Sequence, residues 1–303
     1  MKKRSNEFDL LKCIGIVSVI FGHLVPYLPF KICIYSFHMP LFFFISGYFL
    51  KPRTFRRQLA KSINGLVVPY LYTCIVMLII KIVKYGFSYE LVEEWFLISV
   101  YAVPSNAIPG KHMGIKQVGP IWFLLALFWA QIYVQMIRKI KTGWKIVFVS
   151  LGMALAIIIG NKIWLPFAIL NGAMGAFFVF AGNECAKPIN YSNALDEIQK
   201  SIFSSQSAMG KILEGKRFSL VVAITIWGTC IILDCFRRLN FSLSIFQFPL
   251  YGLGILGALA AIFTLYFGVK VIGKHSNKIT SISEFVGGGH LEYFVFILLT
   301  WNY

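Results

Sequence analysis

Long apolar runs recur along this chain, and their length restricts the folds that it can adopt. A helix needs about 20 mainly apolar residues to cross a bilayer, because each residue advances it by only ~1.5 Å. Eight runs approach this length, and a ninth extends from about residue 285 to the last residue. The eight span residues 10–28, 32–50, 66–83, 120–137, 144–160, 164–182, 218–235 and 249–272. The sequence therefore predicts an all-α fold, a polytopic integral membrane helical bundle of about nine transmembrane helices.

The composition agrees with a membrane protein and excludes two other classes. Hydrophobic residues make up 58% of the 303 residues and charged residues only 14%, whereas soluble chains carry about 25% charged residues. Disordered chains are excluded as well, because they have low hydrophobicity. No polar segment is long enough for a separate aqueous domain, so residues 1–303 are predicted to form a single membrane domain. Asp9 and Lys12 interrupt the first run, which indicates a retained helix and not a cleaved signal peptide.

The formal net charge of +17 is distributed unevenly between the connecting segments. With the N-terminus placed in the cytoplasm, 20 of the 29 lysine and arginine residues fall in cytoplasmic segments and seven in external ones. Basic residues are enriched in the cytoplasmic loops of membrane proteins. The bias therefore predicts a multi-pass protein with a cytoplasmic N-terminus, and it explains the positive charge by the lipid bilayer without a nucleic-acid partner.

Ionisable residues within the predicted spans are concentrated in the first two. Asp9, Lys12 and His23 share one face of the first predicted helix, because their spacings of three and eleven residues match whole turns. His38 lies about as far from the external end of the second run as His23 does from that of the first. Titratable side chains inside a bilayer are costly and usually functional. The pattern predicts a proton-transfer centre at the two histidines, above a polar shaft that reaches the cytoplasm.

Structural roles for the same residues stay open at this point. An intramembrane histidine is often a structural hydrogen-bonding group, which applies most to His38 taken alone. Asp9 and Lys12 could instead mark only the entry of the helix into the membrane, with the lysine reaching towards the interface. The six cysteines form no CxxC pair, so the sequence predicts neither a disulfide framework nor a metal site.

The first two runs also carry a recognisable pattern. Asp9-Leu-Leu-Lys12, ten further residues and His23 precede the motif Ser36-Phe-His38-Met-Pro40-Leu-Phe-Phe-Phe-Ile-Ser46-Gly47-Tyr48. Together with Val-Pro-Tyr at 68–70 and Pro-Ile-Trp-Phe-Leu at 120–124, this pattern resembles the acyltransferase 3 family. The branch it is most similar to is the fucose 4-O-acetylase-like membrane acetyltransferases. The resemblance implies nine to ten transmembrane helices in the bacterial cytoplasmic (inner) membrane, acetyl-CoA as donor and a cell-surface saccharide as acceptor.

The resemblance also implies roles for residues at matching positions. His23 matches the essential first-helix histidine of the family, and His38 matches the motif histidine of the second helix. Lys12 matches the basic residue that precedes the first histidine. The tail departs from the family, since residues 287–293 read Gly-Gly-Gly-His-Leu-Glu-Tyr and Ile297 stands near the position of a later histidine.

The donor-binding residues are expected in the basic segment of residues 51–61. Arg53 and Arg56 match the spacing of an Arg-x-x-Arg element, whereas Lys61 and Asn64 lie closer to the usual distance before the Val-Pro-Tyr element. Arginine and lysine are suited to phosphate groups. The residues expected to bind the CoA phosphates are Lys12, Arg53, Arg56 and Arg57, with Lys61 as the next candidate.

These expectations combine into a mechanism of acyl transfer. A sugar hydroxyl becomes a good nucleophile when a base removes its proton, and neutral imidazole suits that role. His23 is the expected base, His38 would orient it or relay its proton, and Asp9 is a third member of the catalytic group. No tightly bound cofactor is expected, because acetyl-CoA enters as the donor substrate.

Two other classes of function remain open from the sequence. A transporter or flippase for a lipid-linked saccharide would use the same polar shaft for passage. The chain lacks the internal repeat of many transporters and has few charged groups within the spans after the first hairpin. A purely structural membrane scaffold is the weaker reading. The acceptor hydroxyl, the acyl chain and the oligomeric state cannot be read from these residues.

Overall fold

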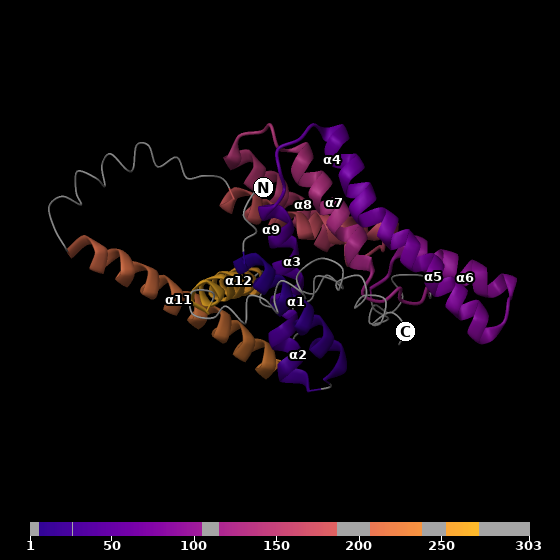
Figure 1. Cartoon of the computed structure of the whole chain (residues 1–303), viewed down its shortest axis with the longest axis horizontal. Coiled ribbons are helices and arrows are strands. Elements are labelled where there is room, and N and C mark those ends of the chain that lie inside the picture. The colour runs from indigo at the N-terminus through magenta and orange to yellow at the C-terminus, as the bar shows by residue number, and fades with distance from the viewer. Residues whose placement is uncertain (1–5, 26, 105–114, 187–206, 238–252, 273–303) are drawn as a thin grey trace.

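The computed structural model describes residues 6–25, 27–104, 115–186, 207–237 and 253–272, and every regular element within these ranges is helical (Figure 1). In chain order the helices are α1 (Asn6–Leu24), α2 (Leu28–Tyr35), α3 (His38–Tyr48), α4 (Phe55–Ser62), α5 (Val68–Tyr85), α6 (Tyr89–Tyr101), α7 (Trp122–Met136), α8 (Thr142–Gly160), α9 (Ile169–Cys185), α11 (Ser207–Arg237) and α12 (Leu253–Ile272). A π-helical turn, Ile63–Val67, joins α4 to α5, and a 3-10 turn, Pro166–Ala168, precedes α9. The predicted ninth span and the atypical tail lie outside the described residues.

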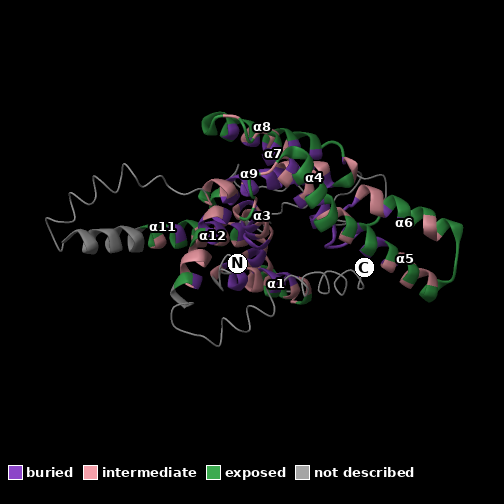
Figure 2. Ribbon diagram, turned by 45° about the horizontal axis from the view of Figure 1, so that its top comes forward, coloured by how far each residue is buried: buried purple, intermediate pink, exposed green. Residues whose placement is uncertain are grey.

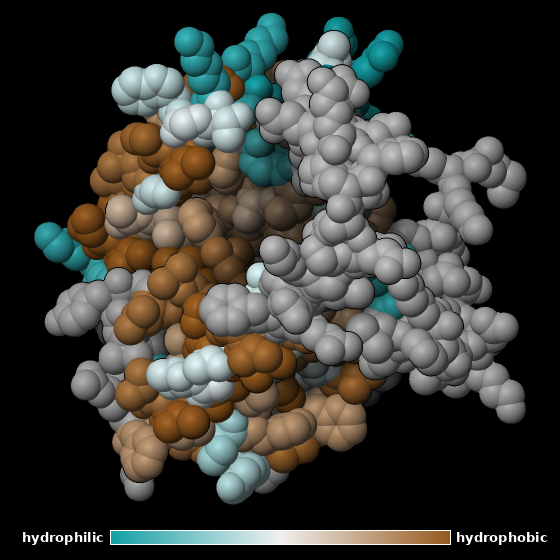
Figure 3. Space-filling view, turned by 90° about the vertical axis from the view of Figure 1, so that its left-hand side faces the viewer, coloured by the Kyte–Doolittle hydropathy of each residue, from teal (hydrophilic) through white to brown (hydrophobic). Residues whose placement is uncertain are grey.

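Six segments of the described chain are long and apolar enough to cross a membrane, namely Leu28–Tyr48, Phe55–Tyr85, Thr142–Gly160, Pro166–Cys185, Ser219–Phe236 and Leu253–Lys270. α7 is apolar but shorter, and α1 carries acidic residues in its first turns. Figure 3 shows a broad band of hydrophobic side chains, with hydrophilic ones gathered at one end. The prediction of an all-α, multi-pass membrane protein is confirmed.

The second span is broken, whereas the sequence analysis expected a continuous helix over residues 32–50. α2 and α3 meet at Ser36 and Phe37, and Phe37 adopts φ −133° and ψ −29°, outside the helical range. Pro40 explains the break, because it has no N–H for the carbonyl of Ser36 and its ring would clash with that carbonyl in a regular helix. As a result His38 starts a new helix, next to carbonyl groups at the end of α2.

The third span starts earlier than the predicted residues 66–83. α4, the π-helical turn and α5 form one helical segment over Phe55–Tyr85. α4 contains no long apolar run, because it is amphipathic: Gln58 and Ser62 are buried, whereas the two arginines of its first turn are exposed. A π-helical turn holds an extra residue, so it changes the face that the following helix presents.

α6 packs along α5, and together they form a hairpin that extends from the rest of the molecule (Figures 1 and 2). The indole Nε1 of Trp95 donates to the carbonyl oxygen of Cys74 at 2.8 Å. The hydroxyl of Tyr70 donates to the carbonyl oxygen of Ser99 at 2.6 Å. These two hydrogen bonds tie the hairpin together, while its outer surfaces are exposed.

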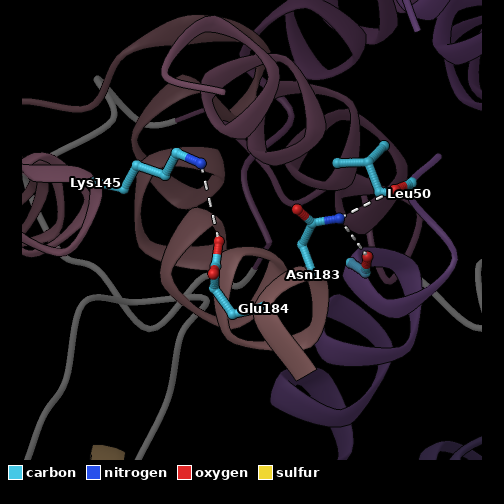
Figure 4. Close-up of polar contacts among 5 residues, drawn as sticks. Leu50, Lys145, Asn183 and Glu184 are labelled. Atoms are coloured by element: carbon cyan, nitrogen blue, oxygen red, sulfur yellow. Dashed lines mark hydrogen bonds and ion pairs between the residues drawn. The ribbon is translucent and has the colours of Figure 1, made fainter. Parts of the chain in front are cut away.

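α3 lies at the centre of the bundle, in contact with α1, α7, α9 and α12. Its crossing with α9 is unusually close, because a side chain on Gly47 or on Gly182 would collide with the backbone of the other helix. Small residues permit such close approach between membrane helices. Asn183 Nδ2 then donates to the carbonyl oxygens of Gly47 at 3.3 Å and Leu50 at 3.0 Å (Figure 4). The C-terminal end of α3 is therefore anchored to α9.

We predict that Gly47→Ala destabilises the protein, because the added methyl group must displace the backbone of α9. Overpacking of this kind costs ~1–3 kcal/mol. Gly152→Ala in α8 is the matched control, since nothing lies within 4 Å of its added methyl group, and alanine is the better helix former by ~1 kcal/mol. Thermal unfolding of both variants in detergent measures the difference. Equal melting temperatures would contradict the close contact.

Candidate active site

His38 occupies the first position of α3, and only 8% of its surface is exposed. Its Nδ1 lies 2.9 Å from the main-chain carbonyl oxygen of Ile34, in the last turn of α2. A carbonyl oxygen can only accept a hydrogen bond, so Nδ1 carries a proton and donates it. In the neutral imidazole Nε2 is then the acceptor. The break before α3 therefore prepares this histidine to accept a proton at a defined atom.

His23 lies in the last turn of α1 and is partly exposed. It is near enough to His38 for an electrostatic interaction. Tyr35 links the two positions: its hydroxyl donates to the carbonyl oxygen of Gly22 at 3.1 Å, and its ring centroid lies 5.3 Å from that of His38. The structure therefore brings together the two histidines that the sequence placed at a similar depth.

α11 supports the break between α2 and α3. The indole Nε1 of Trp227 donates to Ser36 Oγ at 2.9 Å, and that hydroxyl donates to the carbonyl oxygen of Cys33 at 2.7 Å. The ring of Trp227 also meets the ring of Phe37 edge-on, with centroids 5.7 Å apart. These contacts hold the non-helical residues directly before His38.

A pocket of about 270 Å³ lies beside α1 and α3, at the ends of these helices opposite the histidines. We call it the lysine pocket, because Lys12 of α1 and Lys61 of α4 both line it. The remaining polar lining consists of Ser46, Gln58 and Gln131, and the apolar lining includes Phe42, Phe49, Phe123 and Leu127. Two ammonium groups in a pocket of this kind favour an anionic ligand.

Phe42 separates the lysine pocket from the histidines. It lies one turn after His38 and one turn before Ser46 on the same face of α3. Its ring packs against Gly15 of α1, where an added methyl group would lie 2.7 Å from the ring. Ser46 lies eight residues after His38, which is ~12 Å along the helix. An aromatic ring therefore interrupts the polar shaft that the sequence predicted.

Lys12 and Asp9 have different surroundings, although both belong to the predicted polar stripe. The Nζ of Lys12 lies 6.0 Å from the ring centroid of Phe49, at the wall of the lysine pocket. Asp9 is only 5% exposed and does not line that pocket. Lys12 is thus placed to meet a ligand, whereas Asp9 is buried one turn closer to the start of α1.

The three arginines expected to bind the donor also lie outside the lysine pocket. The main-chain carbonyl oxygen of Arg53 accepts two hydrogen bonds, at 2.7 and 3.0 Å, from side chains at the end of α7 and after it. Arg56 and Arg57 are exposed on α4. Lys61, the next candidate in the sequence analysis, lines the pocket in their place.

A chain of side-chain hydrogen bonds runs along one wall of the lysine pocket. Gln58 Nε2 donates to Ser62 Oγ at 2.9 Å and to Gln131 Oε1 at 3.1 Å. Ser62 Oγ donates to Gln131 Oε1 at 2.7 Å, and Gln131 Nε2 donates to Ser46 Oγ at 2.8 Å. Gln58 is 1% exposed, and within the described residues its Oε1 has no partner. A buried acceptor of this kind can be satisfied by an N–H or O–H group of a ligand.

Several of these residues were missed by the sequence analysis. A role for Gln131 could have been predicted from the sequence, because an amide within the apolar run of residues 120–137 needs a polar partner in the bundle. Tyr35 and Trp227 gave no such signal, since aromatic residues are common in membrane helices. Within the part of the chain that the structure describes, no three His, Cys, Asp or Glu side chains could hold a metal ion together.

Comparison with known proteins identifies two relatives of moderate similarity. Over 142 residues the chain is 28% identical to the nodulation protein NolL of Mesorhizobium japonicum, a match that covers 41% of this chain and 34% of that protein. Over 126 residues it is 31% identical to the nodulation protein NolL of Sinorhizobium fredii, covering 33% of this chain and 34% of that protein. The chain thus spans about a third of the length of each. No solved structure matches.

The family comparison extends much further along the chain. The model of the acyltransferase 3 family, described as an acyltransferase domain, matches residues 5–288. This range includes all the described residues, from α1 to α12. It therefore covers both histidines, the lysine pocket and the helices that support them. The chain therefore belongs to the acyltransferase 3 family and is a multi-pass membrane protein.

Proposed function

We propose that this acyltransferase is a membrane O-acetyltransferase that moves an acetyl group from acetyl-CoA to a hydroxyl group of a bacterial cell-surface polysaccharide or its precursor. The observation that carries the proposal is the His38 imidazole, with Nδ1 donating to the Ile34 carbonyl and Nε2 left to accept a proton, within electrostatic reach of His23. A hydroxyl acceptor requires such a base. Family membership favours group transfer over the transporter or flippase considered from the sequence.

In the proposed reaction His23 removes the proton of the acceptor hydroxyl, and the hydroxyl oxygen forms a bond to the carbonyl carbon of the thioester. The carbon–sulfur bond then breaks, and the CoA thiolate takes up the proton from the imidazolium. His38 orients His23 or accepts its proton, since the Ile34 carbonyl oxygen stabilises a protonated ring. Asp9 precedes His23 by fourteen residues on α1, ~21 Å along the helix, so it is too far away to take part directly in this proton transfer.

The lysine pocket supports acetyl-CoA as the donor. Lys12 and Lys61 supply positive charge for a phosphate group. The free Oε1 of Gln58 can accept a hydrogen bond from an amide N–H of the pantetheine arm. From this pocket the arm would follow α1 and α3 past Phe42 to bring the thioester to the histidines.

We further infer that the protein lies in the bacterial cytoplasmic (inner) membrane, with the N-terminus and α4 in the cytoplasm. A cysteine at Ala60, which is exposed on α4, should resist an impermeant thiol reagent in intact cells, whereas a cysteine at Glu90, exposed on α6, should react. The test uses a chain in which the six native cysteines are replaced. Labelling of the cysteine at position 60 but not of the one at position 90 would show that the protein has the opposite orientation in the membrane.

We predict that His23→Gln lowers acetyl transfer by ~100–10,000-fold, because glutamine keeps hydrogen bonding but cannot act as a base. The measurement is transfer from labelled acetyl-CoA by purified protein, with thermal unfolding measured alongside. His112→Gln, at a histidine outside the predicted spans, is the control and should retain activity. Near-normal transfer by His23→Gln together with an inactive His38→Gln would assign the base to His38.

We predict that Lys12→Gln weakens acetyl-CoA binding by about tenfold or more, since a hydrogen bond to a charged group contributes ~1.5–3 kcal/mol. Arg53→Ala and Arg56→Ala should have smaller effects, because neither side chain lines the lysine pocket, and the effect of the exposed Arg56 should fade at high salt, where exposed charges are screened. Equilibrium binding of acetyl-CoA at two salt concentrations separates these cases. Lys141→Ala, another exposed basic residue, is the control. An unchanged affinity in Lys12→Gln would exclude the lysine as a phosphate ligand.

A further inference from the structure

A second pocket, of about 380 Å³, lies on the other side of the segment that follows α3. The ends of α3, α7 and α9 and the start of α8 surround it. We call it the α7–α9 pocket. Phe49 and Leu50 line both this pocket and the lysine pocket, so the two are neighbours separated by one stretch of chain. Nothing in the sequence analysis assigned a role to it.

The α7–α9 pocket has an excess of positive charge. Lys51, Arg138 and Lys145 line it, against one acidic residue, Glu184. Lys145 is buried, with 8% of its surface exposed, and its Nζ lies 4.0 Å from Glu184 Oε1 (Figure 4). One carboxylate can neutralise only one of three cations. The pocket therefore favours an anion with more than one negative charge.

Gln135 adds an unmatched acceptor to the same pocket. Its Nε2 donates to the carbonyl oxygen of Arg53 at 2.7 Å, which fixes the orientation of the amide. The residue is 8% exposed, and its Oε1 has no hydrogen-bond partner in the described chain. A buried acceptor without a partner costs ~1–3 kcal/mol. A ligand that supplies an N–H or O–H group beside its anionic groups would remove this cost.

Aromatic side chains complete the lining. Tyr48 and Phe49 meet edge-on with ring centroids 5.5 Å apart, and Phe180 contributes a further ring. Nucleobases stack on such rings, and their exocyclic N–H groups are hydrogen-bond donors. Cations, a buried amide oxygen and aromatic rings together fit a phosphorylated nucleoside better than a simple inorganic anion.

The size and position of the two pockets indicate how they relate. The lysine pocket, at about 270 Å³, is below the ~300–1,000 Å³ typical for ligand pockets. Acetyl-CoA is a long molecule with a nucleotide at one end and the thioester at the other, so it needs more than one pocket. We propose that the α7–α9 pocket binds the phosphorylated adenosine end of acetyl-CoA, while the lysine pocket holds the start of its pantetheine arm. This inference rests on the proposed function.

The test measures equilibrium binding of labelled adenosine 3′,5′-bisphosphate, the nucleotide end without the arm, to the purified full chain in detergent. Lys51→Ala combined with Lys145→Gln should weaken binding at least tenfold. Lys139→Ala removes an exposed charge next to Arg138 that does not line the pocket, and it should change affinity less than twofold. Lys12→Gln should weaken the binding of acetyl-CoA but change the affinity for the fragment less than twofold, since Lys12 lines the other pocket.

If the double variant fails to fold, Lys51→Ala alone serves in its place, because Lys51 is exposed and its replacement should not disturb folding. Its affinity for the fragment should fall by about threefold. The proposal is overturned if the fragment does not bind, or if it binds equally well to all variants. Displacement of the fragment by micelles that contain phosphatidylglycerol would overturn it in favour of a lipid headgroup. Fragment binding with the expected pattern, in a protein that does not bind acetyl-CoA, would retain the nucleotide site and reject the proposed donor.

Discussion

The missing hydrogen bond at Pro40 is the constraint on which the arrangement of the candidate site depends. Without that N–H, the second span cannot continue as one helix, and α2 ends before His38. The carbonyl oxygen of Ile34 is then available to the Nδ1 of His38. Backbone that leaves the helical path inside a membrane must be supported by protein. Trp227 and Ser36 supply this support, so α11 is part of the site although it is distant in sequence.

α3 connects the two ends of the proposed reaction, because it is held at both of its termini. At its start Trp227 and Ser36 hold the break, and at its end Asn183 and the close contact at Gly47 hold it against α9. The residues directly after α3 then form a wall shared by the two pockets. A shift of α3 along its axis would therefore change the position of His38 and the shape of both pockets together.

The sequence predicted the features that depend on local pattern. Apolar runs located the membrane helices, and the spacing of His23 and His38 predicted that they come together. It did not predict the start of the third span, because amphipathic α4 has no long apolar run. It also favoured the arginines after α3 over Lys61 as donor ligands. Which side of α4 faces the pocket depends on packing against α7, through Gln58 and Gln131, and such long-range contacts leave no local signal.

The separation between the lysine pocket and the histidines explains why polar amides line the pocket wall. About 12 Å of α3 lies between Ser46 and His38, so in the proposed reaction an acyl group brought to the pocket must travel along α1 and α3. A flexible arm with amide groups loses its hydrogen bonds to water on entering the bundle, which is costly unless the protein replaces them. The chain from Gln58 through Gln131 to Ser46 offers such replacement at the pocket. Beyond it, Phe42 packs on Gly15, so the last part of the path is apolar and must open by movement of one ring. An apolar barrier at this point would keep water away from the thioester until the acceptor hydroxyl is present beside the histidines.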